Sequence, residues 1–519
     1  MVRRSLLLGV GGLLGLLIGP LSGRADDPPD RPLTAETFRR VTEQVEPSVV
    51  SILRIRPQPG EGSGELFSQS PPSPDPDNRD VLPNDYGAGV LISPPESEQL
   101  FVLTAYHVVR GGMIDGRPPT ADQSQLQLRF HNRRTCAGRI FAADPRSDLA
   151  VLVFDREELG GDSQELRPLD WRSSEPVRKG DVVVCLGNPY ALARDGSASV
   201  SWGIVSNLAR RPLAPVRREG ADQALSLSQL GTVLQLDARL QLGGSGGPVV
   251  NLDGQLVGIS TALAAIEGYE KSAGFALPVA PPMRRVIETL LLGQEVEYGL
   301  LGVTPGTVGA GEMRRLGAET TQQGLFDRQP SAVEVRSLPD GSPAAKSDRI
   351  QVKDVLLSIE GQTLYSAADL MRIVGELPPE TEVTVELFRP SRGGPERGQV
   401  LTVRSKLGKW PVRDDEGIVA TRPKYPPWRG LRVDYPSARE KFVKHEPRFL
   451  PGVIVVDVAE ASRAAQAQLQ PGNVITHVQG IPVQTPGEFQ RAVSNLTGDV
   501  AVRLYGDRPT DRPSATIQE

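Results

Sequence analysis

The chain has 519 residues, which is too long for one hydrophobic core and predicts about three domains. Apolar residues make up 39% and aromatic residues 5%, as in ordinary globular domains. A net charge of −5 from 58 basic and 63 acidic residues argues against a nucleic-acid-binding protein. The 54 glycines and 46 prolines predict long loops and linkers.

The N-terminus has the pattern of a targeting segment. Arg3 and Arg4 precede an apolar run from Ser5 to Ile18, and Gly23-Arg24-Ala25 places small residues at a cleavage site. The run is short for a membrane span, so residues 1–25 are predicted to be a secretory signal peptide. The protein would then be periplasmic or otherwise exported, without a stable membrane span after cleavage. The alternative is an uncleaved membrane anchor. Residues 26–33 are expected to be a disordered lead-in.

The next segments alternate between regular elements and polar loops. Thr34 can cap a helix that runs to Val45, and Val49 to Ile55 alternates as a strand. Pro57 to Asp85 is rich in Pro, Ser, Gly and Asp and is predicted to be a long loop. Short strands then follow at Gly89–Ile92, Leu100–Leu103, Gln125–Phe130, Thr135–Ala142 and Leu149–Phe154.

A second set of strands extends from Val182 to Val279, interrupted by a polar, charged loop from Arg210 to Leu230. Pro281 to Leu292 carries apolar residues at helical spacing, and Gly293 is expected to end that helix.

The most informative stretch places Ser245 within a run of four glycines, between two apolar strands. Glycines permit a sharp bend and close approach of a substrate, and the amides of Gly243 and Ser245 could bind an oxyanion. Taken alone, the stretch also fits a glycine-rich hairpin with an incidental serine. Its context is a histidine, His107, at the end of an apolar run, and an aspartate, Asp148, just before a buried strand. A Ser-His-Asp triad is therefore predicted.

At these residues the chain resembles the HtrA/Deg family of PDZ-containing, trypsin-like serine proteases. The matching motifs occur in family order and cover most of Phe38 to Leu292: Thr104-x-x-His107-Val108, Ser147-Asp148-Leu149-Ala150-Val151, Gly187-Asn188-Pro189, Gly203-Ile204-Val205-Ser206, Gly243-x-Ser245-Gly246-Gly247 and Gly274-Phe275-Ala276-Leu277-Pro278. The resemblance implies a mainly β fold, with a chymotrypsin-like double β-barrel over residues 34–293. Gly244 departs from the family pattern, which usually has Asn there.

The resemblance also assigns secondary features of the barrels. By position, Leu240, Ile259 and Ala264 would wall the specificity pocket, which favours cleavage after small or medium aliphatic residues. Cys136 and Cys185 would lie in strands of different barrels, so two buried free thiols are expected. No metal or cofactor is expected, because the four histidines are scattered without ligand spacing: His107, His131, His445 and His477.

The C-terminal half contains an internal repeat. Val355 to Gly361 recurs as Val474 to Gly480, 119 residues later, and Ser342-Pro343-Ala344-Ala345 recurs as Ser462-Arg463-Ala464-Ala465. Both copies resemble PDZ domains, at 296–406 and 428–507, joined by a linker at 407–427 and followed by a tail at 508–519.

A PDZ domain binds an extended peptide as an added strand and holds its terminal carboxylate with loop amides. In the first copy, Leu300, Leu301, Gly302 and Val303 fit that carboxylate loop. In the second copy, Arg432 stands where the later glycine would be, so peptide binding and a structural or assembly role both remain open.

The expected function is that of a serine endopeptidase that degrades misfolded or unfolded envelope proteins. The resemblance further implies homotrimers or multiples of trimers, and PDZ domains that bind C-terminal peptides. Two alternatives are a proteolytically silent peptide-binding or chaperone protein, and a scaffold that only presents PDZ domains.

Overall fold

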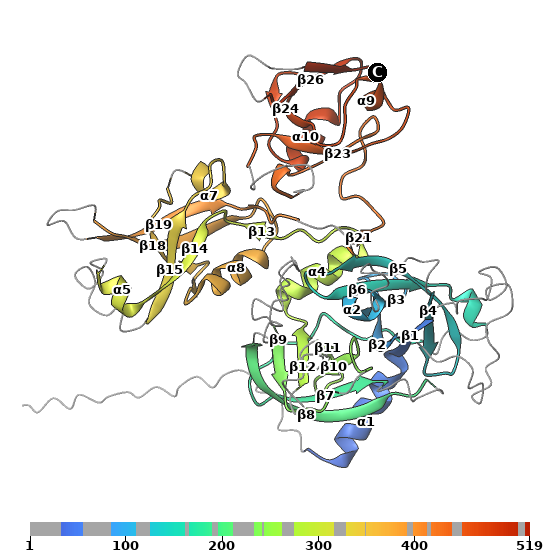
Figure 1. Cartoon of the computed structure of the whole chain (residues 1–519). Helices are drawn as coiled ribbons and strands as arrows, with labels where there is room; N and C mark the ends of the chain where they lie inside the picture. The colour runs from blue at the N-terminus through green and yellow to red at the C-terminus, as the bar shows by residue number, and fades with distance from the viewer. Residues whose placement is uncertain are drawn as a thin grey trace, which may run out of the picture.

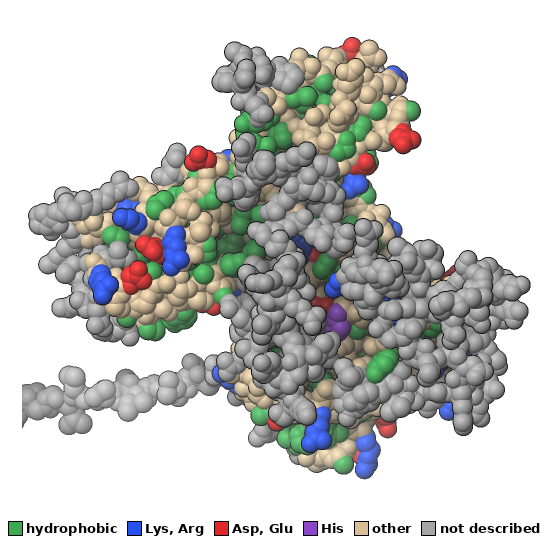
Figure 2. Space-filling view, viewed as in Figure 1, with side chains coloured by type: hydrophobic (Ala, Val, Ile, Leu, Met, Phe, Trp, Pro, Cys, Tyr) green, Lys and Arg blue, Asp and Glu red, His purple; other side chains and the backbone are tan. Residues whose placement is uncertain are grey.

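The computed structural model describes residues 33–55, 85–110, 125–160, 166–188, 196–210, 233–240, 243–261, 274–315, 329–347, 349–391, 398–412, 417–438, 449–506 and 514–518. The expected signal peptide, the loop after Ile55 and the polar loop after Arg210 lie outside these residues. Among the described residues, no helix is long and apolar enough to cross a bilayer. On the face shown in Figure 2, the described basic and acidic side chains are interspersed.

A capped helix opens the described chain. Helix α1 (Ala35–Val45) begins at Thr34, whose hydroxyl accepts a hydrogen bond from the amide of Thr37 at 3.3 Å. It buries Val41 and Val45 in the cluster that joins the barrels, which confirms the predicted helix.

Six described strands close into the first barrel, in the order β5-β4-β1-β2-β3-β6 with β6 pairing back to β5. They are β1 (Val49–Ile55), β2 (Asp85–Ile92), β3 (Phe101–Ala105), β4 (Gln125–Phe130), β5 (Thr135–Asp144) and β6 (Leu149–Phe154), and the short helix α2 (Tyr106–Arg110) follows β3. Every strand predicted here is confirmed, with ends shifted by a few residues, because the apolar runs fill the barrel interior.

The second barrel is also closed, in the order β10-β11-β12-β9-β8-β7. Its strands are β7 (Val182–Gly187), β8 (Ser199–Arg210), β9 (Val233–Leu236), β10 (Pro248–Val250), β11 (Leu256–Thr261) and β12 (Gly274–Pro278). Helix α4 (Pro281–Leu291) follows, and Gly293 ends it with a φ of 72°. One hydrophobic cluster joins the barrels and α4, so they pack as one unit.

Two smaller β units carry the repeat (Figure 1). The first contains β14 (Thr304–Gly309), α5 (Ala310–Arg315), β15 (Ser331–Ser337), α7 (Pro343–Lys346), β16 (Val355–Ile359), β17 (Gln362–Thr363), α8 (Ala367–Gly375), β18 (Glu382–Arg389) and β19 (Gln399–Lys406). The second contains β22 (Leu431–Asp434), β23 (Val453–Val458), α9 (Arg463–Gln466), β24 (Val474–Val478), β25 (Ile481–Pro482), α10 (Pro486–Val493), β26 (Val500–Leu504) and β27 (Ser514–Ile517).

Two expected boundaries need correction. The segment expected to be only a linker, 407–427, forms β20 (Gly408–Lys409), which pairs with β13 (Gly299–Leu300), and β21 (Val419–Ala420), which pairs with β5 of the first barrel. The segment expected to be a tail, 508–519, supplies β27, which pairs with β26. β27 belongs to the second unit because the side chain of Ile517 is fully buried in its core.

Candidate functional site

His107 lies where a fully buried strand ends. β3 is buried along its whole length, and the chain turns directly into α2. The buried hydroxyl of Thr104 donates to the carbonyl of Ala88 on β2 at 2.7 Å, which fixes the end of β3. The His107 ring therefore starts from a rigid position, with its side chain 22% exposed.

Asp148 lies in the turn between β5 and β6, with a φ of 57°. That left-handed conformation is unusual for a residue other than glycine, so the surroundings must hold it. Its Oδ2 lies 2.8 Å from Nδ1 of His107, and its Oδ1 accepts from the His107 amide at 3.0 Å. The Tyr106 amide donates to the Asp148 carbonyl at 2.8 Å. Asp148 thus fixes both the ring and the backbone of His107.

The charge of Asp148 changes the protonation of its neighbour. Burial by itself would lower the pKa of His107, but the field of the Asp148 carboxylate and the hydrogen bond to it raise that pKa above its ordinary value. With Nδ1 donating to Asp148, Nε2 is left as the proton acceptor. Nε2 is buried, and it has no hydrogen-bond partner among the described atoms.

The Ser245 loop belongs to the second barrel but is bonded to the first. The amide of Ala88 on β2 donates to the Ser245 carbonyl at 2.8 Å. Gly246 has a φ of 84°, and a Cβ there would lie 2.2 Å from the Ala88 carbonyl oxygen and 2.3 Å from Oγ1 of Thr104. Only glycine allows this approach. Ser245 therefore lies at the seam between the barrels. Its loop is bonded to β2, which pairs with β3, the strand that leads to His107.

A serine hydroxyl holds the glycine loop from behind. Oγ of Ser260 on β11 donates to the carbonyl of Gly244 at 2.5 Å and lies 3.0 Å from that of Gly247. Gly243 has a φ of 93°, a conformation that suits glycine. The expected oxyanion donors are the amides of Gly243 and Ser245. The role of both amides remains a prediction.

Sequence reasoning missed two contributors to this site. Oγ1 of Thr261 lies 3.5 Å from Oδ2 of Asp148, and Ser260 holds the Ser245 loop. Both are buried and end an otherwise apolar strand, β11. Hydroxyls in a fully buried strand are the signal that could have identified them.

Two of the three residues expected to wall the specificity pocket lie within the described structure. Ile259 is fully buried in the cluster that joins the barrels. Leu240 packs beside Gly274, where a Cβ would lie 2.9 Å from the leucine side chain. Ala264 lies outside the described residues. The specificity pocket remains a prediction.

The first repeat unit has an open strand edge. β14 pairs with β15 on one side, and its other side carries no strand among the described residues. Before it, Leu301 is buried, and Gly302 has a φ of 76°. In the described structure the amide groups of Leu301, Gly302 and Val303 donate to no protein acceptor, and Leu300 precedes them in β13.

The corresponding loop of the second unit is engaged by its own chain. The amide of Leu431 donates to the Trp428 carbonyl at 2.8 Å. Arg429 donates to the carbonyls of Ile517 at 2.8 Å and Gly498 at 2.7 Å. Arg432 is exposed and lies 3.9 Å from Asp457.

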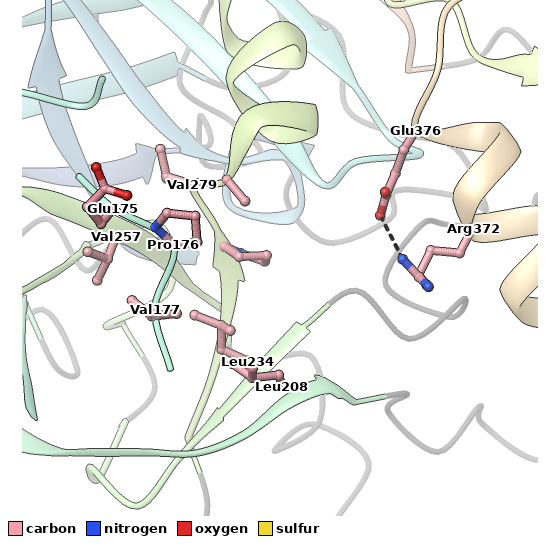
Figure 3. Close-up of a pocket in the computed structure, with 11 residues that line it drawn as sticks. Glu175, Pro176, Val177, Leu208, Leu234, Val257, Val279, Arg372 and Glu376 are labelled. Carbon is pink, nitrogen blue, oxygen red and sulfur yellow. Dashed lines mark ion pairs between the residues drawn. The ribbon is translucent and has the colours of Figure 1, made fainter. Parts of the chain in front are cut away.

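A hollow of about 180 Å³ lies at the seam between the second barrel and α8 (Figure 3). Val177, Leu234 and Val257 line the barrel side. On the other side, Arg372 of α8 forms an ion pair of 3.6 Å with Glu376, the residue directly after α8. The hollow is separate from His107 and Ser245, and it shows that the first repeat unit rests on the barrel through α8.

Comparison with known proteins agrees with this architecture. The family model of the trypsin-like peptidase domain matches residues 87–259, and that of the PDZ domain matches residues 434–517. A probable periplasmic serine endoprotease DegP-like of Pseudomonas fluorescens is 27% identical over 90% of this chain and 90% of its own length. The periplasmic serine endoprotease DegP of Salmonella typhimurium is 25% identical over 95% of this chain and 94% of its own.

Solved structures include the HtrA-type protease AlgW with a tripeptide, at 22% identity and a TM-score of 0.49 over 73% of this chain and 98% of that one. The serine endoprotease from Yersinia pestis matches at 22% identity and a TM-score of 0.42, over 73% and 99%. The curated relatives and both domain matches identify a periplasmic serine endopeptidase that is similar to the HtrA/DegP family of PDZ-containing, trypsin-like serine proteases.

Proposed function

We propose that this endopeptidase cuts unfolded or misfolded envelope proteins with Ser245 as nucleophile, His107 as general base and Asp148 as the group that orients His107. The observation that carries the proposal is the 2.8 Å contact between Asp148 and Nδ1 of His107, beside the seam where the Ser245 carbonyl bonds to β2. A buried carboxylate on Nδ1 leaves Nε2 able to take a proton from a serine.

The reaction proceeds in two halves. Oγ of Ser245 attacks the peptide carbonyl carbon while its proton passes to Nε2 of His107. The C–N bond then breaks, and His107 returns the proton to the leaving amine, which leaves an ester on Ser245. Water attacks the ester, gives one proton to His107, and the acid product departs as that proton returns to Ser245. The amides of Gly243 and Ser245 would stabilise the oxyanion of both steps.

The Ser245→Ala variant tests this assignment. We expect it to fold with the unfolding temperature of the wild type and to lose activity on a denatured protein by a factor on the order of 10⁶. Gel-based degradation and labelling with a fluorophosphonate probe measure the two properties. Undiminished proteolysis in the variant would refute the nucleophile. An unlabelled wild type would favour a silent peptide-binding protein.

We also propose that the first PDZ unit binds the substrate. A peptide would add to the open edge of β14, and its terminal carboxylate would accept from the amides after Leu300, at Leu301, Gly302 and Val303. The second unit would serve assembly, because Arg429 and the Leu431 amide are already bonded within that unit.

Self-association is supported by an apolar stripe on the outside of the second barrel. Val200, Trp202 and Ile204 alternate along β8 with 43%, 56% and 37% of their surface exposed. Phe38 of α1 extends the stripe, since its ring centroid lies 5.0 Å from that of Trp202. Contiguous exposed apolar surface of this kind is typical of subunit interfaces. We therefore propose that copies of the chain assemble through this stripe into homotrimers.

A further inference from the structure

The turn that carries Asp148 is built around a second buried aspartate, Asp144, whose surface is fully covered. Its Oδ2 accepts from the Ser147 amide at 2.9 Å, and its Oδ1 accepts from Nε of Arg146 at 2.8 Å. The Tyr298 hydroxyl donates to the same carboxylate. Asp144 thus fixes the backbone at Ser147, the residue directly before Asp148.

Two of these partners connect the turn to the segment that leaves the protease for the first PDZ unit. Nη2 of Arg146 donates to the Val296 carbonyl at 2.6 Å. The guanidinium lies 4.7 Å above the centre of the Tyr298 ring, and that ring is 2% exposed. The buried guanidinium therefore bridges the turn and residues 296–298, and a change in that segment would reach Asp148 through one side chain.

The inter-PDZ segment holds the other side of the same connector. Lys409 is 1% exposed, and its ammonium lies 3.2 Å from Glu295, 3.3 Å from Glu297 and 3.1 Å from Asp434 of β22. Buried charges persist only when they are paired in this way. Glu295 also lies 3.9 Å from Nη2 of Arg146, so a continuous set of ionic contacts joins the second PDZ unit to the connector, and the connector to the turn.

A strand from the inter-PDZ segment also closes on the turn from outside. Val419 of β21 pairs with Ala143 of β5, directly before Asp144. Gly417 packs so closely that a Cβ there would lie 1.9 Å from the Tyr106 hydroxyl and 3.4 Å from Pro145. Two segments thus enclose the turn. One is residues 296–298, which lead from the protease to the first PDZ unit, and the other is β21 of the inter-PDZ segment.

We propose that Arg146, Asp144 and Tyr298 are positioning residues, which transmit the placement of the PDZ connector to the carboxylate of Asp148. The inference rests on the role proposed above for Asp148. The φ of 57° at Asp148 is a left-handed conformation that few residues other than glycine, asparagine and aspartate adopt, and the bond from the Ser147 amide to Asp144 holds the turn in which it occurs. When the connector shifts, the carboxylate loses its alignment with Nδ1 of His107, and the rate of acylation falls while substrate binding does not change.

Tyr298→Phe and Arg146→Lys test the proposal in the full-length chain. The first removes the hydroxyl that donates to Asp144 and keeps the ring. The second keeps the charge but lacks the planar guanidinium that bonds Asp144 and the Val296 carbonyl together. We expect kcat on a short peptide to fall roughly 10- to 100-fold in each variant, because small misplacements of reacting groups have effects of that size. KM should stay within about twofold, because neither residue is placed to contact substrate.

Arg389→Lys is the matched control. Arg389 likewise bonds a buried aspartate, Asp354, through Nε and Nη2 at 2.8 Å, and it donates to the Arg349 carbonyl at 2.7 Å, but within the first PDZ unit. It should lose comparable thermal stability and keep the wild-type kcat. Wild-type kcat in both test variants, or an equal loss of kcat in the control, would overturn the proposal. If Arg146→Lys fails to fold, Tyr298→Phe alone decides.

Labelling of Ser245 by a fluorophosphonate separates this inference from the proposed function. A wild-type chain that is not labelled refutes the nucleophile and with it the triad. A labelled wild type together with unchanged variants refutes only the positioning role.

Discussion

At the residue scale, the contact between Asp148 and His107 decides how the site responds to pH. The base must be neutral to accept a proton, and its raised pKa means that it becomes protonated at a higher pH than a free imidazole. Activity should therefore fall as the pH falls through this raised value. The carboxylate both orients the ring and sets the position of the acid limb of kcat/KM, which is the range of low pH over which activity is lost.

Asp148→Asn separates those two effects. Without the carboxylate, burial remains and lowers the pKa of His107, so the acid limb of kcat/KM should move to lower pH. The amide also favours the wrong tautomer, and kcat should fall by a factor on the order of 10⁴. Peptide hydrolysis across a pH series measures both. Asp354→Asn, which removes an equally buried acid far from the site, is the control, and an unmoved limb in Asp148→Asn would contradict the assignment.

The sequence predicted the three proposed catalytic residues but not the residues that hold them. His107, Asp148 and Ser245 stand in short motifs with their own local signature. Arg146 and Tyr298 do not, because they are 152 residues apart and meet only in the fold, where their ring and guanidinium lie 4.7 Å apart. Contacts that depend on tertiary packing leave no periodicity to read.

At the element scale, the internal repeat is a repeat of local geometry. Glu360 and Gln479 share a φ of 48°, and each precedes a glycine with positive φ, Gly361 and Gly480. The two serine caps correspond as well, since Ser342 begins α7 and Ser462 begins α9. These turns could be predicted from the sequence because their residues have restricted conformations. β27 could not, because Ser514 to Ile517 is too short to show a clear alternation of apolar and polar residues.

Gly302 and Gly309 allow a test of the proposed peptide edge at opposite ends of β14. A Cβ at Gly302 would lie 2.7 Å from the Pro343 ring at a φ of 76°, whereas one at Gly309 would meet nothing within 4 Å. In a Ser245→Ala background, Gly302→Ala should weaken binding of a peptide with a free C-terminus by about tenfold or more, since charge-assisted hydrogen bonds are lost. Gly309→Ala should bind as the parent does.

Fluorescence anisotropy of a labelled peptide measures both affinities. Amidation of the peptide terminus should have the same effect as Gly302→Ala and add nothing to it. Equal binding of the free and amidated peptides would show that no carboxylate is held by the loop.

At the scale of the whole molecule, the PDZ units are not attached by a loose tether. The segment expected to be a spacer pairs with both the first PDZ unit and the first barrel, through β20 and β21 (Figure 1). Its prolines and charges predicted exposure, and two-residue strands are too short to show a period. Gly417 of this segment packs against Tyr106, the residue directly before His107. A shift of the segment would therefore displace a neighbour of the site.

Assembly is the remaining property at this scale, and the apolar stripe on β8 makes it testable. Trp202→Asp places a charge at the most exposed ring of the stripe, which would have to be desolvated in any interface built there. We expect the wild type to have the mass of a trimer or a multiple of it in light scattering after size exclusion, and the variant to shift to the mass of one chain. Val352→Asp, at an apolar residue of the first PDZ unit that is 44% exposed, should keep the wild-type mass. A trimer that survives Trp202→Asp would place the interface elsewhere, because an isolated aspartate buried between subunits costs more than the other contacts of the stripe could offset.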